Sequence, residues 1–317
     1  MITKSNLPLD IPFRKRLSFI RRYNKFTFNK DRVILFAGDQ RVEHLITSFY
    51  GEGIYTGDLY PKHYFDIASS SPISALAVPY GLLTLYGGDY PKVPYVVKLN
   101  SLSKLSKKGY GYTFSRRWAD VEDVASLQKK AKLNILGVGY TAYLGIKEES
   151  KMFAEASFLI RQAHSLGYPF ILWIYPKGKG VADEKSFTNI ATACSVGNAL
   201  GADFIKINAP KERKKGSVEN LSNAIKAAGK TKVLVAGGSA ISFDELITRS
   251  HKQVYAAGAT GVALGRNIHQ RSVKEASKLI ESLYKVLVEE EKLSLNLKNF
   301  SKVSPVIKRK KQVSSII

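Results

Sequence analysis

Short apolar runs rich in β-branched residues recur between residue 33 and about residue 290, and stretches with helical periodicity separate them. Runs of this composition are typical of strands that are buried on both faces. They read VILFAGD (33–39), SALAVPY (74–80), YVVKLN (95–100), NILGVGYTAY (134–143), FILWIYP (170–176), FIKINAP (204–210), KVLVAGG (232–238) and GVALGRN (261–267). The pattern therefore predicts a series of buried strands.

The intervening segments predict helices that pack one face against those strands. Between residues 148 and 167, apolar side chains fall on one helical face from Phe153 to Ala163, and Gly167 follows as a terminator. Three later segments also have helical periodicity and end at a glycine. Alternation of strands and helices favours a parallel sheet that is covered by helices.

The eight runs predict an α/β fold of the (β/α)8, or TIM-barrel, type, because both their number and their span of about 230 residues fit that architecture. A doubly wound open sheet is the alternative. The motif G-x-G-x-x-G does not follow the first run, which disfavours dinucleotide binding. We expect a short N-terminal extension (1–32), a catalytic barrel (33–290) and a polar, basic C-terminal tail (291–317).

The charge of the chain is strongly positive, with 49 Lys and Arg against 26 Asp and Glu and a formal net charge of +23. Nucleic-acid binding, attraction of anionic metabolites or a generally basic set of cellular proteins would each explain this balance. No nucleic-acid-binding signature accompanies the basic runs, so we do not expect nucleic acid as the main partner. With one cysteine, Cys194, no membrane-length apolar run and no signal peptide, we expect a cytoplasmic protein.

Lys206 is the most unusual residue of the predicted strands, because it stands in the apolar run FIKINAP. Burial away from water lowers the pKa of a lysine. More of the side chain is then the neutral amine, which can attack a carbonyl carbon. The structural alternative is that Lys206 reaches solvent or pairs with Asp39 or Asp203. Lys98, in the run 95–100, either tunes Lys206 as a neighbouring cation or itself pairs with an acidic group.

Other polar and aromatic residues fall at the carboxyl ends of the predicted strands, where barrel enzymes form their sites. Asp39 ends the first run, and Trp173 and Tyr175 share one face of the fifth. The last two runs end in glycines and an arginine suited to a phosphate: Gly237, Gly238, Gly265 and Arg266. The glycines would also suit simple turns. No grouping has convincing metal-ligand spacing, so we predict no metal.

The motifs DQRVEH, VKLN, GVGYTAYLG, LWIYPKGKG, GADFIKI and GVALGRN occur in this order between residues 33 and 290. In order and approximate spacing they resemble those of the archaeal-type class I fructose-bisphosphate aldolases. The resemblance implies a metal-independent, cofactor-free lyase of central carbon metabolism that cleaves a phosphorylated sugar through a Schiff base. It also implies a homo-oligomer.

The resemblance also implies roles for individual residues. Lys206 matches the Schiff-base lysine of the family, Tyr175 its proton-transferring tyrosine, and Asp39 the acidic residue after the first strand. Trp173 matches the aromatic residue of the pocket. The matches to the binding site for the C1 phosphate are Gly237, Gly238, Gly265 and Arg266.

Two departures from the family pattern bear on the substrate. Many archaeal members read D-H-G after the first strand, whereas this chain reads Asp39-Gln40-Arg41, and Ala236 stands where a serine is frequent. The nearest alternative is therefore another Schiff-base enzyme of sugar phosphates, such as 2-amino-3,7-dideoxy-D-threo-hept-6-ulosonate synthase. A protein without catalytic activity that binds nucleic acid through its basic termini is the alternative from a different class.

Overall fold

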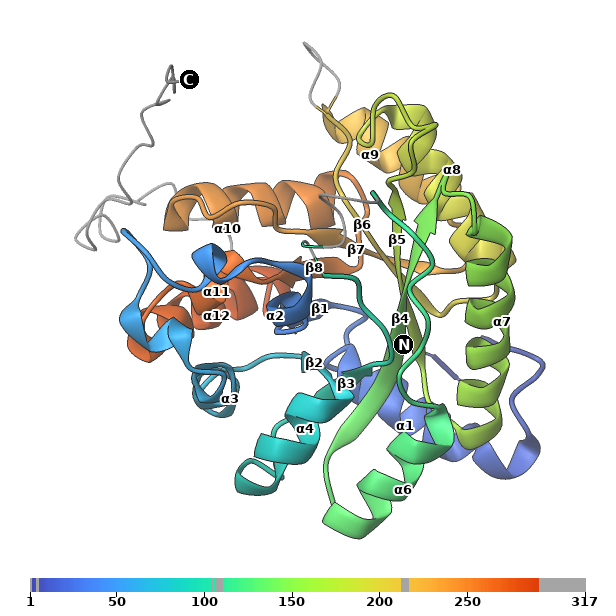
Figure 1. Ribbon diagram of the computed structural model, residues 1–317, viewed down its shortest axis with the longest axis horizontal. Helices are drawn as coiled ribbons and strands as arrows, with labels where there is room; N and C mark the ends of the chain where they lie inside the picture. Colours follow the sequence, from blue (N-terminus) through green and yellow to red (C-terminus); the bar gives the residue numbers. More distant parts are fainter. Residues whose placement is uncertain (1, 4–5, 104, 106–110, 212–216, 291–317) are drawn as a thin grey trace.

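Eight parallel strands close into a barrel in the computed structural model, which describes residues 2–3, 6–103, 105, 111–211 and 217–290. Each strand pairs with its sequence neighbours, and β1 closes the ring with β8 (Figure 1). The strands are β1 (Val33–Ala37), β2 (Ala75–Pro79), β3 (Tyr95–Lys98), β4 (Ile135–Leu144), β5 (Phe170–Pro176), β6 (Phe204–Ile207), β7 (Lys232–Ala236) and β8 (Gly261–Leu264). The predicted (β/α)8 fold is confirmed, and the open sheet is excluded.

Helices surround the barrel and alternate with its strands (Figure 1). The α-helices are α1 (Arg16–Phe26), α2 (Gln40–Glu43), α3 (Lys62–Ser69), α4 (Tyr80–Tyr86), α6 (Val121–Ala131), α7 (Glu149–Leu166), α8 (Phe187–Ala199), α9 (Ser217–Lys226), α10 (Phe243–His251), α11 (Arg266–His269) and α12 (Val273–Leu287). Short 3₁₀ turns are η2 (Phe13–Lys15), η3 (Ile46–Ser48), η4 (Thr56–Leu59) and η5 (Gly87–Asp89), and the π-helix η6 (Lys252–Ala256) continues α10.

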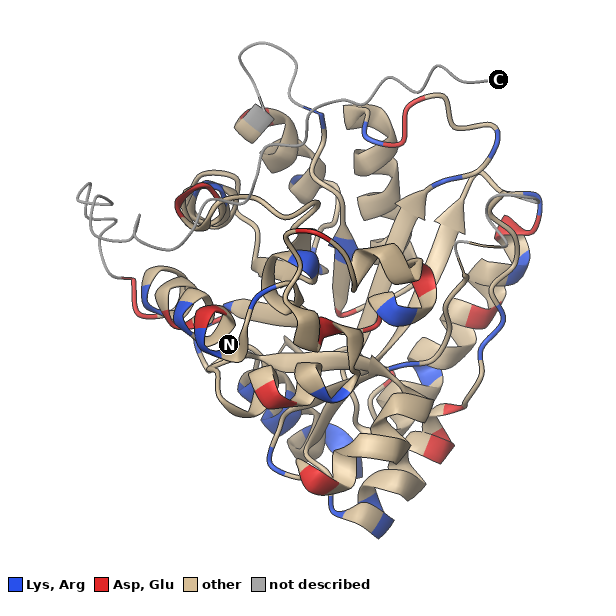
Figure 2. Cartoon of the chain, turned by 60° about the vertical axis from the view of Figure 1, so that its left-hand side comes forward, with Lys and Arg blue, Asp and Glu red and all other residues tan. Residues whose placement is uncertain are grey.

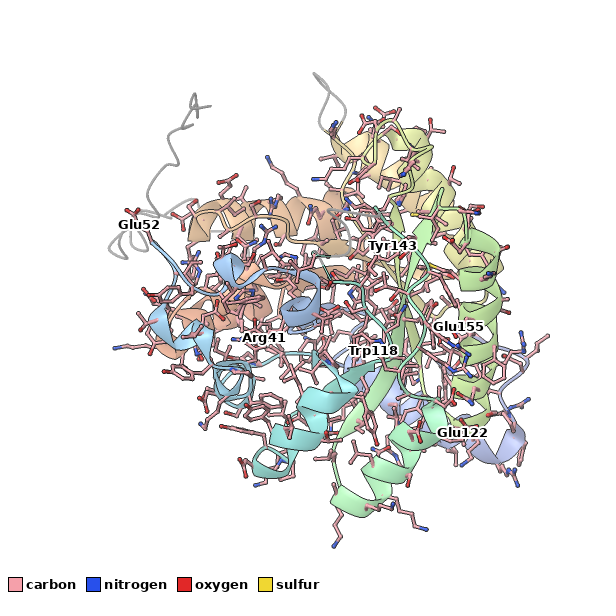
Figure 3. All side chains as sticks on the ribbon, viewed as in Figure 1. Arg41, Glu52, Trp118, Glu122, Tyr143 and Glu155 are labelled. Atoms are coloured by element: carbon pink, nitrogen blue, oxygen red, sulfur yellow. The ribbon has the colours of Figure 1, made fainter. Side chains whose placement is uncertain are left out.

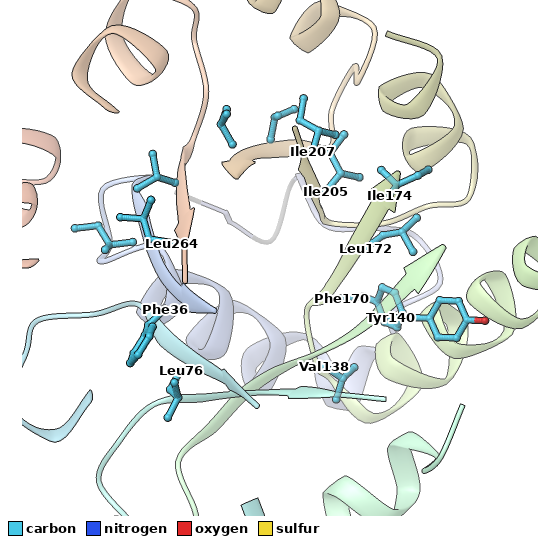
Figure 4. Packing of buried hydrophobic residues seen from close by; sticks show 14 of the residues in the cluster. Phe36, Leu76, Val138, Tyr140, Phe170, Leu172, Ile174, Ile205, Ile207 and Leu264 are labelled. Atoms are coloured by element: carbon cyan, nitrogen blue, oxygen red, sulfur yellow. The ribbon is translucent and has the colours of Figure 1, made fainter. Parts of the chain in front are cut away.

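Alternation along each strand divides the core into two layers. One layer lies between the strands and the helices, and Figure 4 shows part of it, with Phe36, Leu76 and Leu172 on the outer side of the strands. The second lies inside the barrel, where Leu35, Val96 and Trp173 belong to one buried cluster. Apolar side chains on both faces explain why the strands read as continuous apolar runs.

The segment before β1 covers the amino end of the barrel. The buried rings of Phe19, Tyr23 and Phe26 on α1 belong to the same cluster as the barrel interior. The ring centroids of Tyr23 and Phe26 lie 4.9 and 5.0 Å from that of Phe204, at the start of β6. The N-terminal extension therefore closes one end of the barrel and leaves the carboxyl end for a site.

Basic residues are spread over many helices and loops around the barrel (Figure 2). This arrangement differs from the single basic stripe that is typical of a nucleic-acid groove. The expected basic tail, 291–317, lies outside the described residues. Among the helices that are described, no segment combines the length and the low polarity needed to cross a bilayer.

Candidate active site

Lys206 lies inside the barrel on β6, and 5% of its surface is exposed. The pairing of β5 with β6 places it level with Trp173, and its Nζ is 5.6 Å from the centroid of the Trp173 ring. Burial lowers the pKa of Lys206; the charges of Asp39 and Glu43 act in the opposite direction, and that of Lys98 lowers it further. Within the described part of the chain Lys206 belongs to no ion pair, so it has the environment of an amine nucleophile.

The two carboxylates considered as alternative partners of Lys206 pair with other residues. Asp203 contacts His164, with Oδ2 3.1 Å from the ring Nε2. Asp39 pairs with Lys98, whose Nζ lies 3.4 Å from Oδ2. Lys98 thus fills both roles left open by the sequence, since it pairs with an acidic group and its charge also acts on Lys206.

Lys98 is held by several groups at the end of β3. Its Nζ donates hydrogen bonds to the Thr141 hydroxyl and to the Asn100 carbonyl oxygen at 3.2 Å, and it lies 4.6 Å from the centroid of Trp173. The Asn100 side chain in turn bonds the backbone of Thr141. The sequence analysis did not identify Asn100 or Thr141 as site residues. Both lie in the motifs VKLN and GVGYTAYLG, which could have pointed to them.

Asp39 lies two residues after the end of β1, directly before α2, and is 1% exposed. Apart from its ion pair with Lys98, neither carboxylate oxygen has a hydrogen-bond partner among the described residues. The Trp173 Nε1 group is likewise buried and unpaired there. Unpaired buried polar groups cost free energy, so their concentration beside one lysine indicates a place where a polar ligand completes the hydrogen bonds.

Tyr175 lies two residues beyond Trp173 on the same face of β5 and is half-buried. Burial, followed by the negative charges of Glu43 and Asp39, raises the pKa of Tyr175 well above its usual range. Tyr143 is its partner in the register between β4 and β5, and the Tyr143 ring packs 4.8 Å from that of Tyr112. Tyr175 is therefore a phenol, not a phenolate, at neutral pH.

The two tyrosines of β4 have different surroundings. Tyr140 points outward between the strands and the helices (Figure 4), and its hydroxyl donates to Glu155 on α7 at 2.9 Å. Tyr143 lies nearer the carboxyl end of β4. Figure 3 labels both Tyr143 and Glu155. Tyr140 therefore does not line the interior of the barrel, because its side chain points to the outer layer.

The loops after β7 and β8 meet as the glycines suggested. A Cβ at Gly237 would lie 2.6 Å from the Leu264 side chain, which would have to shift, and Gly238 has a φ of +72°, so both positions favour glycine. The buried Asn267 side chain donates to the carbonyl oxygens of Gly237 at 3.3 Å and Ser239 at 3.1 Å. Asn267 thereby holds the two loops together, and the motif GRN was the sequence signal for it.

Gly265 and Arg266 open α11 at the end of β8. A Cβ at Gly265 would collide with the amide of Gln40, which lies 3.1 Å from His269 Nε2. His269 Nδ1 is 2.6 Å from the carboxylate of the buried Asp58. Gln40, which departs from the common family pattern, therefore supports the backbone that precedes Arg266.

Arg41, the other departure, does not enter the lysine site. Its guanidinium donates to the backbone oxygens of Leu59, at 3.0 Å, and of Asp58. It also stacks over the rings of Phe49 and Tyr64, at 4.8 and 4.9 Å from their centroids. Arg41 braces the long connection between β1 and α3, so its replacement of a glycine leaves Lys206 and Tyr175 in place.

These features indicate the class of the protein. A (β/α)8 barrel with a desolvated lysine among polar groups at the strand ends is typical of an imine-forming lyase. The chain belongs to the DeoC/LacD family of aldolases, whose family model matches residues 33–271. The described residues contain no group of three or more His, Cys, Asp or Glu side chains that could hold a metal ion.

Relatives agree with this class over nearly the whole chain. The chain is 42% identical over 292 residues to the fructose-bisphosphate aldolase/6-deoxy-5-ketofructose 1-phosphate synthase of Methanocaldococcus jannaschii, covering 92% of this chain and 93% of the relative. It is 31% identical to the class 1 fructose-bisphosphate aldolase of Halobacterium salinarum, covering 82% and 91%.

Solved structures show the same relationship. The fructose-bisphosphate aldolase of Slackia heliotrinireducens superimposes with a TM-score of 0.87 and 42% identity, over 92% of each chain. An archaeal fructose-1,6-bisphosphate aldolase, with its catalytic Lys bound to the carbinolamine intermediate, superimposes with a TM-score of 0.71 and 28% identity. That superposition covers 84% of this chain and 99% of the other.

Proposed function

We propose that the protein is a class I fructose-bisphosphate aldolase, which reversibly cleaves fructose 1,6-bisphosphate to dihydroxyacetone phosphate and glyceraldehyde 3-phosphate. The observation that carries the proposal is the desolvated Lys206, 5% exposed, between Trp173 and the Asp39–Lys98 pair. Family membership and the relatives named above support the substrate class.

In the proposed reaction the neutral Lys206 amine attacks the ketone, and loss of water gives a protonated imine. This cation accepts the electron pair of the C3–C4 bond when that bond breaks, so the reaction requires neither a metal nor a cofactor as electron sink. Asp39, whose oxygens form an ion pair with Lys98 but have no hydrogen-bond partner among the described residues, holds the carbinolamine and substrate hydroxyls. Tyr175 assists the proton movements as the C3–C4 bond breaks and the aldehyde forms, and Trp173 shapes a dry pocket.

The C1 phosphate binds where the loops after β7 and β8 meet. Gly237, Gly238 and Gly265 allow backbone N–H groups to approach the anion, and Arg266 adds a positive charge. Asn267 keeps the two loops at a fixed separation. The phosphate then lies at the ends of β7, which adjoins β6, and of β8, which adjoins β7.

Borohydride reduction in the presence of dihydroxyacetone phosphate, followed by peptide mass spectrometry, tests the proposal. We expect one adduct per chain on the peptide that contains Lys206. Labelling of Lys98, or no labelling at all, would contradict it. Activity that survives EDTA is a second expected result, and activity restored only by a divalent metal would rule out the imine mechanism.

A second activity is suggested by the name of the relative from Methanocaldococcus jannaschii, which is also a 6-deoxy-5-ketofructose 1-phosphate synthase. Carbons 4 to 6 of that product correspond to an aldehyde beside a ketone and a methyl group. The acceptor for the second activity would thus be a three-carbon aldehyde that carries a ketone and a methyl group. Its rate of condensation is compared with that of glyceraldehyde 3-phosphate, at a fixed concentration of dihydroxyacetone phosphate, to separate the two activities. The same assay with larger acceptors tests heptulosonate synthesis.

We also infer a homo-oligomer that acts in the cytoplasm. Leu9, Phe13 and Leu17 are 96%, 85% and 62% exposed on one short N-terminal segment, and several large exposed apolar side chains on one segment favour a subunit contact. Light scattering coupled to size-exclusion chromatography tests the assembly. A monomer at micromolar concentration would contradict it, and cell fractionation tests the location.

A further inference from the structure

The loop between β7 and α10 has three consecutive backbone N–H groups that bind no protein acceptor in the part of the chain that the structure describes. They belong to Gly238, Ser239 and Ala240. Gly238 and Ser239 are exposed, so a ligand can reach these groups. Gly238 has a φ of +72°, and left-handed residues in loops are typical of turns whose successive N–H groups form an anion-binding concavity. The loop therefore offers several hydrogen-bond donors to an anion.

Two side chains from neighbouring helices hold the carbonyl oxygens of the same loop. The Gly237 oxygen accepts from the Arg249 guanidinium on α10 at 2.5 Å and from the Asn267 amide on α11 at 3.3 Å. Asn267 also donates to the Ser239 oxygen at 3.1 Å, and its own Oδ1 accepts the Ile241 N–H at 3.0 Å. The protein thus binds the acceptors of the loop and leaves its donors for a ligand.

The direction of a carbonyl group fixes the direction of the next N–H group. The peptide unit is planar and trans, so its C=O and N–H bonds point in opposite directions. Because the Gly237 carbonyl points to Arg249 and Asn267, the N–H of Gly238 points away from them. The Ser239 carbonyl, which Asn267 holds, directs the next N–H in the same way. The side chains behind the loop therefore determine where its donors point.

Both side chains are themselves fixed. Asn267 is fully buried, and its carbonyl oxygen accepts from Arg271 Nε at 3.0 Å, while the same guanidinium donates to the Ile241 oxygen at 3.0 Å. Arg249 lies in the last turn of α10 and is half-buried. A hydrogen bond from a guanidinium is charge-assisted and about twice as strong as one between neutral groups. Arg249 therefore holds the Gly237 carbonyl more firmly than a neutral donor would.

We propose that Arg249 is a positioning residue for phosphate binding, which acts with Asn267 through the peptide between Gly237 and Gly238. The inference rests on the proposed function, in which the C1 phosphate binds at this loop. Arg249 differs from Arg266 in that it holds the backbone and does not touch the phosphate. Donors that already point at the anion need no reorientation when it binds, so their preorganisation strengthens binding. Glycine permits this conformation of the loop, and the two side chains select it.

Two variants of the full chain test the inference. Arg249→Met keeps most of the apolar stem and removes the hydrogen bond to Gly237, and Asn267→Leu removes donors to the same loop without a change of net charge. Arg161→Met is the matched control, because it removes the same positive charge from α7, where Arg161 donates to Ser157 of its own helix at 2.7 Å. Thermal unfolding checks that each variant is folded, and Asn267→Ser replaces the leucine variant if that chain does not fold.

Dihydroxyacetone phosphate and dihydroxyacetone differ only in the phosphate, and borohydride traps the imine of either ketone on Lys206. We expect both variants to raise the concentration of dihydroxyacetone phosphate needed for half-maximal trapping by about tenfold to a hundredfold, the usual effect of removing a group that orients ligand-binding atoms. The concentration of dihydroxyacetone needed should stay unchanged, whereas a general structural defect would raise both. In steady-state cleavage KM should rise more than kcat falls, and Arg161→Met should match wild type throughout.

Trapping of dihydroxyacetone phosphate by Arg249→Met at wild-type concentrations would overturn the inference alone. A loss in Arg249→Met that the neutral change at Asn267 does not share would also overturn it, because Arg249 would then act on the phosphate by its charge and not through the loop. A different result bears on the proposed function itself. If wild type forms no Lys206 adduct, or traps both ketones at equal concentrations, the proposed phosphate site fails and the positioning role fails with it.

Discussion

The two ends of the barrel use their polar residues in opposite ways. At the amino end, a cluster around His164 is paired within itself: His164 lies 2.8 Å from Asp10 and 3.1 Å from Asp203, and Asp203 also accepts the Phe170 N–H at 2.8 Å. At the carboxyl end, Asp39 has an ion pair with Lys98, but both its oxygens and the Trp173 Nε1 group are buried without hydrogen-bond partners among the described residues. The second cluster therefore keeps hydrogen-bonding capacity that the first has used.

The apolar packing differs in the same sense. Phe19, Tyr23 and Phe26 close the amino end as a layer of aromatic rings. The carboxyl end instead carries half-buried tyrosines and glycines whose positions leave backbone groups accessible. The difference teaches that the aromatic layer closes the amino end, whereas the carboxyl end holds desolvated groups such as Lys206 and Asp39 that a closed end would not need. Changes at the two ends should therefore affect different measurements.

The largest effect is expected for Lys206→Met at the carboxyl end. Methionine keeps most of the apolar stem and removes the nucleophile, so the chain should fold with unchanged stability or better, since a desolvated amine is lost. Cleavage and borohydride trapping should both be abolished. Circular dichroism, thermal unfolding and mass spectrometry check this, and persistent cleavage would show that another lysine forms the imine.

Tyr175→Phe should slow cleavage by about 10²–10⁴, as expected for a positioned proton-transfer group, and still allow trapping on Lys206. Tyr140→Phe is the matched control, because Tyr140 points away from the barrel interior and bonds Glu155. The control should keep its kcat and lose only stability. Normal turnover in Tyr175→Phe would show that Tyr175 only lines the pocket and has no role in proton transfer.

Phe19→Ala tests the amino end. Phe19 is fully buried and packs 5.7 Å from the His164 ring, so truncation should reduce the free energy of unfolding by about 3–5 kcal/mol. The kcat of the folded fraction should not change. Phe13→Ala, at a position 85% exposed on the same segment, should change stability by less than about 0.5 kcal/mol. Denaturant titration and kinetics measured below the transition compare the two, and a lower kcat in Phe19→Ala would contradict the separation of the two ends.

Arg266→Ala should raise KM more than it lowers kcat. A charge-assisted hydrogen bond to phosphate contributes about 1.5–3 kcal/mol, which corresponds to a loss of affinity of roughly tenfold to a hundredfold. Inhibition by inorganic phosphate should weaken in parallel. An unchanged KM would place the phosphate elsewhere.

The smallest effect concerns pH and the amino end. Burial opposes the charged form of His164, but hydrogen bonds to Asp10 and Asp203 outweigh it and raise the pKa to about 10. Its contribution to stability is therefore fully present below the unfolded pKa of 6.5 and is lost as pH rises through about 10. The pKa of Asp10 is lowered, so its contribution is present above the unfolded value of 3.8 and is lost in acid.

Asp10→Asn should make the loss of stability between neutral pH and pH 10 shallower, because one of the two partners that raise the His164 pKa is removed. The measurement is the difference in unfolding free energy between wild type and variant at several pH values, since ionisation of other groups then largely cancels. A constant difference over that range would mean that the His164–Asp10 contact does not hold a proton in solution.

Local patterns in the chain were sufficient for the barrel and for the central lysine. The apolar run of β5 was predicted with its observed bounds, Phe170–Pro176, and the alternation of the faces placed Trp173 and Tyr175 together. Other strands end earlier than predicted: β1 stops at Ala37 and β6 at Ile207. The predicted runs include Gly38 and Asp39 after β1 and residues 208–210 after β6, and these residues lie in the loops at the carboxyl end of the barrel.

What the sequence by itself determined is which residues are buried, since apolar periodicity records the face on which each side chain lies. The tertiary structure alone decided which polar groups meet: Lys98 with Asp39, Gln40 with Gly265 and Glu43 with Ser101. Asp10 and His164 are separated by 154 positions, yet their side chains are in contact. Hydrophobic burial is a property of one position and its near neighbours, whereas a hydrogen bond requires two atoms within about 3 Å, a distance set only when the whole barrel closes.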